Sequence, residues 1–114
     1  MAEDTYLTGK TTIDPEVLLT IARLTALSVE GVSRMATGPH NVDSLLKRSY
    51  SNGVKVEVEN NTVYVDLYLI MKRDINLLET SRKVQQKIKR AILEMVGMEI
   101  GTINIHVEDI DYKD

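Results

Sequence analysis

Apolar and polar residues alternate most regularly in residues 54–71, and this stretch organises the rest of the chain. The apolar positions of its two limbs are Val54, Val56 and Val58, then Val63, Val65, Leu67, Leu69 and Met71. Such alternation is typical of strands with one buried face. Between the limbs, Asn60 and Asn61 tolerate the positive φ that a tight type I′ turn requires. We therefore predict a β-hairpin whose valine face the other elements cover.

A first helix is predicted from Pro15 to about Ser28. Asp14 is placed to cap its free N–H groups, and proline suits the first helical position. The apolar side chains of this segment are Val17, Leu18, Leu19, Ile21, Ala22, Leu24, Ala26 and Leu27. A helix this apolar is covered on more than one side. Either the sheet and a second helix cover it, or its outer side makes a subunit contact, for which the candidates are Leu19, Arg23 and Leu27.

A second helix is predicted over about residues 77–96, with Asn76 as its N-cap and Gly97 as its end. Its apolar face follows steps of three and four residues, which is amphipathic spacing. The members of this face are Leu77, Ser81, Val84, Ile88, Ala91, Ile92 and Met95. This pattern predicts a helix packed on one face of the sheet.

Shorter elements complete the chain. A final strand is predicted over residues 102–109, where Ile103, Ile105 and Val107 alternate with polar residues. Weaker patterns indicate strands at residues 9–13 and within residues 29–35, and a short helix around residues 42–49. The predicted order is β-α-(β)-β-β-α-β. We therefore predict an α+β two-layer sandwich, with two helices packed on one face of a small mixed or antiparallel sheet.

The length of 114 residues fits one domain. We expect this domain at residues 9–110, with a flexible N-terminus at residues 1–8 and a flexible tail at residues 111–114. The acidic start lacks an apolar segment of the secretory type, and the longest apolar run is far too short to span a membrane. These features favour a cytoplasmic protein.

Reactive constellations are absent from the sequence. The chain has no cysteine, which excludes disulfides, thiolate metal sites and cysteine nucleophiles. His40 and His106 do not share the spacing of metal ligands. His106 beside Glu57 or Asp66 would resemble a general base with its carboxylate, but no nucleophile is placed next to it. We expect no enzyme activity, no metal and no cofactor.

Polar side chains are expected on the sheet face opposite the helices. They are Lys55, Glu57, Glu59, Tyr64, Asp66, Tyr68, Asn104, His106 and Glu108. Tyr64 and Tyr68 share a side, as do the base-stacking aromatics of RNA-binding sheets. Carboxylates outnumber the single lysine, however, which is the wrong sign for contact with phosphates. We interpret the tyrosines as cross-strand partners.

The second helix carries a basic outer side. Its cations are Arg82, Lys83, Lys87, Lys89 and Arg90, opposed by Glu79 and Glu94. Such a face can meet nucleic acid, anionic lipid or an acidic protein surface, or it can simply be solvated. The net charge of −3 argues against nucleic acid as the main partner.

Several short segments together resemble the alkaline shock protein family, the Gls-type general stress and envelope stress response proteins. They are Val29-Glu30-Gly31-Val32, Gly53-Val54-Lys55-Val56, Arg82-Lys83-Val84-Gln85, Met95-Val96-Gly97 and Ile103-Asn104-Ile105-His106-Val107. The resemblance covers residues 9–110. Where members of the family often have Tyr-Gly before the second helix, this chain has Arg73-Asp74, and aspartate can adopt left-handed geometry at some cost.

The resemblance implies a non-enzymatic cytoplasmic protein that self-associates and has no catalytic residues. Some members of the family sit beneath the membrane through a separate anchor protein. Our first hypothesis is therefore a homo-oligomeric structural or interaction protein near the cell envelope. The alternative is a small nucleic-acid-binding module that uses the basic face of the second helix.

Overall fold

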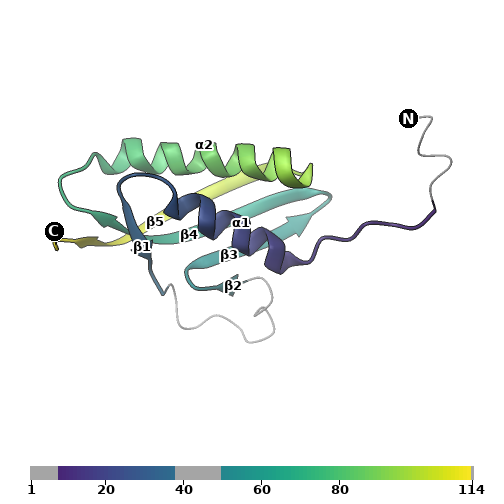
Figure 1. Cartoon of the computed structure of the whole chain (residues 1–114), viewed down its shortest axis with the longest axis horizontal. Coiled ribbons are helices and arrows are strands. Elements are labelled where there is room, and N and C mark those ends of the chain that lie inside the picture. The colour runs from purple at the N-terminus through teal and green to yellow at the C-terminus, as the bar shows by residue number, and fades with distance from the viewer. Residues whose placement is uncertain (1–7, 38–49, 114) are drawn as a thin grey trace.

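The computed structural model describes residues 8–37 and 50–113. These residues form two helices and five strands (Figure 1). In chain order they are α1 (Pro15–Leu27), β1 (Val32–Met35), β2 (Tyr50–Ser51), β3 (Val54–Glu59), β4 (Thr62–Lys72), α2 (Leu77–Val96) and β5 (Glu99–Asp111). The helix predicted around residues 42–49 and most of the predicted flexible N-terminus lie outside the described residues.

The hairpin of β3 and β4 has the predicted geometry. Its antiparallel register runs from Val54 opposite Leu67 to Glu59 opposite Thr62. Asn60 and Asn61 have φ values of 52° and 63°, as a type I′ turn requires at both central positions. The asparagine pair therefore fixes the register, and with it the face on which every valine of the hairpin lies.

The central strand of the sheet is β4. On one side it pairs in parallel with β5 along its whole length, from Thr62 to Lys72. On the other side β3 pairs with residues 62–67 and β1 with residues 69–71, both antiparallel. Outside β3 lies β2. The sheet is thus mixed, and β1 and β3 lie end to end along a single edge of β4.

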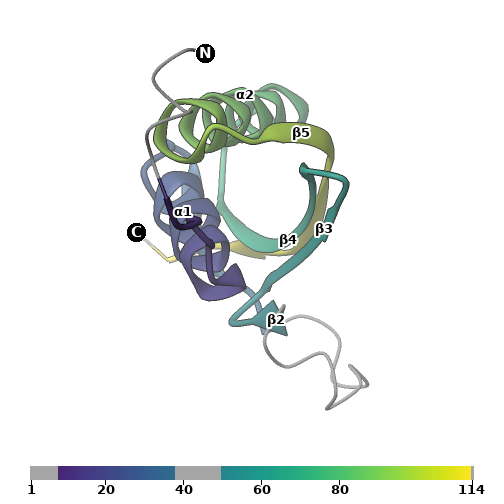
Figure 2. The same ribbon diagram turned by 90° about the vertical axis from the view of Figure 1, so that its right-hand side faces the viewer.

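The two helices pack on the same face of this sheet. Figure 2 shows the strands curving in an arc whose concave side faces α1 and α2. The sheet contributes Val54, Val56, Val63, Val65, Leu67, Leu69 and Met71 to the core, and the helices contribute Leu18, Leu19, Ile21, Ala22, Ala26, Val84, Ile88 and Ile92. The predicted α+β two-layer sandwich is therefore confirmed.

Local caps set the helix boundaries. The Asp14 carboxylate accepts a 2.9 Å hydrogen bond from the Glu16 backbone N–H at the start of α1. The Asn76 side chain accepts from the Glu79 N–H, also at 2.9 Å, and Gly97 ends α2 in the left-handed region. Asp74 also lies in that region, with φ of 60°. Asp74 therefore adopts the left-handed turn geometry before α2, at the position where members of the resembled family often have Tyr-Gly.

Two sequence-based predictions, a strand and a boundary, are wrong. Residues 9–13 form no strand, because this polar segment has only Ile13 to bury and that side chain stays 40% exposed. Strand β5 includes Asp111, which was assigned to the flexible tail. The Asp111 carboxylate accepts a 2.7 Å hydrogen bond from Ser33 Oγ and lies 3.2 Å from Arg34 Nη1, so it ties the end of β5 to β1.

The junction of β1 and β3 generates a prediction about Gly53. Its φ is +81°, and an added Cβ would collide with the Ala36 carbonyl oxygen. We expect Gly53→Ala to lower the free energy of unfolding by about 3 kcal/mol or more, from left-handed strain and backbone overpacking. Gly97→Ala is the matched control, since Gly97 is also left-handed but has open space around it; it should lose only about 1–2 kcal/mol. Equal losses in urea unfolding would contradict this account.

The Asp111 contact predicts a dependence of stability on pH. The hydrogen bond from Ser33, followed by one from the Lys113 backbone, lowers the pKa of Asp111 below its ordinary value. A carboxyl with a lowered pKa stabilises the fold above its unfolded pKa, and this contribution is lost as pH falls through the folded value. Asp111→Asn should therefore be less stable than the native chain at about pH 7, and the difference should shrink and vanish as the pH falls below the folded pKa of Asp111. A constant difference across this range, measured by thermal unfolding, would exclude the linkage.

Candidate interaction surfaces

The outer side of α1 carries an apolar stripe. Val17, Leu24 and Leu27 are 44%, 56% and 38% exposed, and the exposed Thr20 lies between them. Steps of three and four residues place these four side chains in one row along the helix. Large apolar side chains gathered in a row indicate a contact surface more strongly than scattered ones do. We name these four residues the α1 stripe.

The structure separates the three residues predicted for self-association. Leu19 is only 5% exposed and belongs to the core, so its assignment to a free outer side is wrong. Arg23 is half-buried beside the α1 stripe, and Leu27 is part of it. The error arises because α1 is covered by both the sheet and α2, which buries a wider arc of the helix than sequence periodicity indicates. A role of Arg23 and Leu27 in self-association stays a prediction.

A polar cluster occupies the convex face of the sheet. Asp66 Oδ1 accepts a hydrogen bond from Asn104 Nδ2 and lies 3.1 Å from His106 Nε2. The His106 ring stacks on Tyr68, with centroids 4.5 Å apart. Burial, followed by the charge of Asp66, raises the pKa of Tyr68. The predicted proximity of His106 to Asp66 is therefore confirmed.

The side chains of this cluster form their polar and ring contacts with one another. Asp66 has two neighbours on β5, and the imidazole is covered on one side by a ring. Tyr64 is placed similarly, because its ring lies over Gly101, where an added Cβ would collide with it. Within residues 8–37 and 50–113 no group of three His, Cys, Asp or Glu side chains is arranged to hold a metal ion. The cluster fits cross-strand stabilisation of the sheet.

The cations on the basic face of α2 fall into two groups, those that form an ion pair and those that do not. All five predicted cations are exposed. Lys83 lies 3.7 Å from Glu79, and Arg90 lies 3.2 Å from Glu94. The other cations, Arg82, Lys87 and Lys89, have no ion pair with any described residue. The positive charge of this face is therefore only partly neutralised by the carboxylates of α2 itself.

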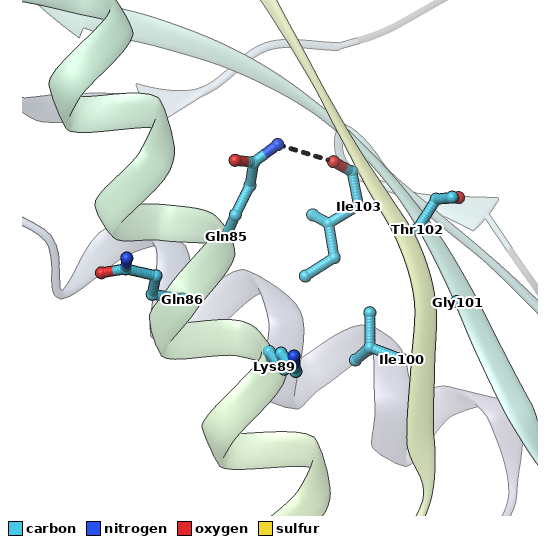
Figure 3. A pocket seen from close by; sticks show the side chains of 7 residues that line it. All are labelled: Gln85, Gln86, Lys89, Ile100, Gly101, Thr102 and Ile103. Atoms are coloured by element: carbon cyan, nitrogen blue, oxygen red, sulfur yellow. Dashed lines mark hydrogen bonds between the residues drawn. The ribbon is translucent and has the colours of Figure 1, made fainter.

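A shallow groove separates α2 from β5 (Figure 3). One part, of about 230 Å³, is lined by Gln85, Gln86, Lys89, Ile100, Gly101, Thr102 and Ile103. A second part, of about 200 Å³, is lined by Lys89, Leu93, Met98, Glu99 and Ile100. Because the parts share Lys89 and Ile100, they form one continuous surface, which we name the α2–β5 groove. The Gln85 amide donates a 2.9 Å hydrogen bond to the Ile103 carbonyl across it.

Sequence reasoning missed this groove and most of the α1 stripe. The stripe could have been found from the spacing of Val17, Thr20, Leu24 and Leu27, once one side of the helix is known to be buried. The groove depends on β5 lying at the sheet edge beside α2, and strand order has no signal in a single sequence. The basic residues were found, but not the division between paired and unpaired ones.

Comparison with known proteins gives the family. The sequence profile of the alkaline shock protein 23 family, whose function is described as cell envelope-related, matches residues 3–112. The chain belongs to this family. The resemblance to alkaline shock proteins is thereby confirmed over almost the whole chain, including both helices and the hairpin.

Relatives of the chain are found in Bacillus subtilis and Streptococcus pyogenes. The chain is 34% identical to the uncharacterized protein YqhY of Bacillus subtilis over 114 residues, covering 96% of this chain and 82% of that protein. It is 32% identical to the uncharacterized protein Spy1535 of Streptococcus pyogenes, covering 90% of this chain and 79% of that protein. The alkaline shock protein family thus includes relatives that match nearly the full length of this chain.

Solved structures share the fold at low sequence identity. Two forms of the MamM CTD, the second of them a zinc form, have TM-scores of 0.53 and 0.51 and are 10% and 12% identical to this chain. The alignments cover 87% of this chain and 100% and 89% of those chains. At this identity the likeness concerns the fold alone. Neither described helix of this chain is long and apolar enough to cross a membrane.

Proposed function

We propose that this chain is a non-enzymatic member of the alkaline shock protein family that acts near the cell envelope by self-association. In this proposal α1 of one copy pairs with α1 of a second copy. The observation that carries it is the α1 stripe, an apolar row on a helix whose other sides are already covered. The family's cell envelope-related description supports the setting.

The spacing of the α1 stripe fits an antiparallel helix pair. Steps of three and four residues are those of a coiled-coil seam. A two-fold axis near Thr20 would bring Val17 of one copy against Leu24 of the other. Leu27 would then meet the segment that enters the helix, where Ile13 is exposed. The stripe is thus self-complementary, as an isologous contact requires.

Charges beside the α1 stripe favour the same arrangement. Glu16 and Arg23 flank it on one side, and neither forms an ion pair with another described residue. In the antiparallel pair, Glu16 of each copy lies near Arg23 of the other, because a two-fold axis across the helices keeps the equivalent flanks of both copies on the same side of the seam. These flanking charges would select orientation more than they would add affinity.

The size of the contact sets its strength. A helix of 13 residues is about 20 Å long, so α1 alone gives an interface at the small end of specific contacts. We expect a dimer with a dissociation constant of roughly micromolar order. Such a protein would be a monomer when dilute and a dimer where it is concentrated, for example beneath a membrane through an anchor protein.

The remaining parts of the proposal concern chemistry and location. Among the described residues, the His106–Asp66 pair contacts the Asn104 amide and the Tyr68 ring, and no serine or threonine hydroxyl forms a hydrogen bond with it, which supports a protein without enzyme activity. A cytoplasmic location at the inner face of the membrane, reached through a partner, follows from the resemblance. The acidic convex face of the sheet disfavours nucleic acid as the partner.

A charge placed in the α1 stripe tests the self-association. Leu24→Glu should raise the dimer dissociation constant at least tenfold, because a carboxylate would be buried against the apolar Val17 of the other copy at two places in the interface. The measurement is mass against concentration, by light scattering after size exclusion. Leu78→Glu is the matched control, since Leu78 is 63% exposed on α2 and lies outside the stripe. A native chain that stays monomeric at all concentrations would overturn the proposal.

Reversing the flanking charges tests the orientation. Glu16→Lys and Arg23→Glu should each weaken the dimer several-fold, because each brings like charges together twice across the axis. The double variant Glu16→Lys/Arg23→Glu should restore association to near the native value. Analytical ultracentrifugation of the four proteins completes the cycle. Additive losses in the double variant would show that these residues do not face each other.

A further inference from the structure

We propose that the α2–β5 groove binds an extended acidic peptide segment of a partner protein, which adds to the sheet as a strand beside β5. This inference does not rest on the proposed self-association, because it uses the side of α2 that faces β5, whereas α1 lies on the other side of α2. Figure 2 shows α1 on one side of α2 and β5 on the other. An occupant of the groove would leave the α1 stripe accessible.

The edge strand provides the backbone for such an addition. Among the described residues β5 pairs with no strand other than β4, so its other side presents N–H and C=O groups to which no strand is paired, the Ile103 carbonyl accepting from the Gln85 side chain instead. Irregularities in the register leave Gly101 and Glu108 as extra residues opposite β4. Between these two bulges, Thr102 to Val107 run in regular register. This regular stretch is long enough to pair with a short added strand.

The groove supplies side-chain contacts beside that edge. Helix geometry places Leu78, Arg82, Gln85, Lys89 and Leu93 in one row along α2. Gln85 and Lys89 line the groove directly, and Leu93 and Ile100 form an apolar part at its end. Each part is smaller than the roughly 300 Å³ typical of the smallest small-molecule sites. An extended chain, which needs little depth, fits this shape better than a compact ligand.

Charge identifies the occupant as acidic. Arg82 and Lys89 share the row beside the groove, and neither has an ion pair with another described residue. Glu99 lines the far end next to Leu93 and would repel a carboxylate there. The segment that fits therefore places carboxylates near Arg82 and Lys89 and an apolar side chain between Leu93 and Ile100.

Gln85 marks the position of the added strand. Its amide donates to the Ile103 carbonyl (Figure 3), which is the role that a backbone N–H of an added strand would take.

A second copy of β5 fits the sheet edge less well than a peptide of a partner protein does. Antiparallel pairing of two β5 strands near Asn104 would bring Glu99 of one copy close to Asp109 of the other, and like charges directly opposite destabilise a strand pair.

Binding of a synthetic peptide to the full chain tests the proposal. The probe is a fluorescein-labelled peptide of alternating valine and glutamate, and the readout is fluorescence anisotropy at moderate salt. We expect Arg82→Glu and Lys89→Glu each to weaken binding about tenfold. Lys87→Glu is the matched control, because Lys87 is also exposed without an ion pair to any described residue but lies on the other flank of α2. It should change binding less than about twofold.

A second peptide separates strand addition from attraction by charge. It has the same charge but proline in place of each valine, so it lacks half of the backbone donors. We expect no binding of this peptide, and slower hydrogen exchange at residues 102–107 of the chain only with the first. Equal binding of both peptides, or an equal effect of Lys87→Glu, would overturn the proposal.

Other occupants would show themselves in the same assays. Binding to anionic phosphatidylglycerol vesicles that depends on Arg82 and Lys89, without binding of the first peptide, would overturn the proposal in favour of a lipid surface. Loss of self-association in Lys89→Glu would assign the groove to a second copy and overturn it too. Leu24→Glu should bind the peptide as the native chain does, so failure of the dimer and failure of the groove are distinguishable.

Discussion

Burial of the central strand is the constraint on which the rest of the structure depends. Strand β4 is hydrogen-bonded on both sides and buries the side chains of Val63, Val65, Leu67, Leu69 and Met71 almost completely. Such a strand is stable only if its apolar face is covered along its whole length. Both helices contribute to this cover, since side chains of α1 and α2 belong to the same core as those of β4. At the same time its two edges must be paired. One edge is filled by β5, and the other needs β1 and β3 in succession, which forces their junction at Gly53, where only glycine fits.

These requirements also determine which surfaces are left. Since α1 and α2 share one face and pack against each other, α1 keeps one outer flank free, and that flank carries the α1 stripe. Because α2 connects the parallel strands β4 and β5, it lies beside the sheet edge that β5 forms. The α2–β5 groove is therefore a consequence of the crossover connection. The convex face remains uncovered, and its side chains satisfy one another across strands, as Asp66 does with Asn104 and His106.

Local features of this fold could be predicted from sequence because their causes are local. Asn60-Asn61, Asp14, Asn76 and Gly97 each perform a task set by their own backbone conformation, and each was predicted correctly. The α+β class followed from the change of period between the hairpin and the helices. Strand order and surface exposure could not be predicted, because they depend on contacts between distant segments. Leu19 shows the limit: its apolar character was plain, but whether it faced the core or a partner depended on where α2 lies. Thr11 and Ile13 favour β structure intrinsically, yet they form no strand, because the segment has no buried surface against which a strand would pack.

The two candidate surfaces differ in a way that assigns them different tasks. The α1 stripe is apolar, and the partner proposed for it is a second copy of this chain. The α2–β5 groove combines unpaired cations with an open strand edge, so its natural partner carries the opposite charge and an extended conformation. Because α1 and the α2–β5 groove lie on opposite sides of α2, the proposed dimer through α1 would keep two grooves open. A partner that displays two acidic segments would then engage both, and its second contact would form at the effective concentration set by the linker rather than in bulk solution. Weak contacts at each surface would thereby combine into firm attachment only where the protein is concentrated.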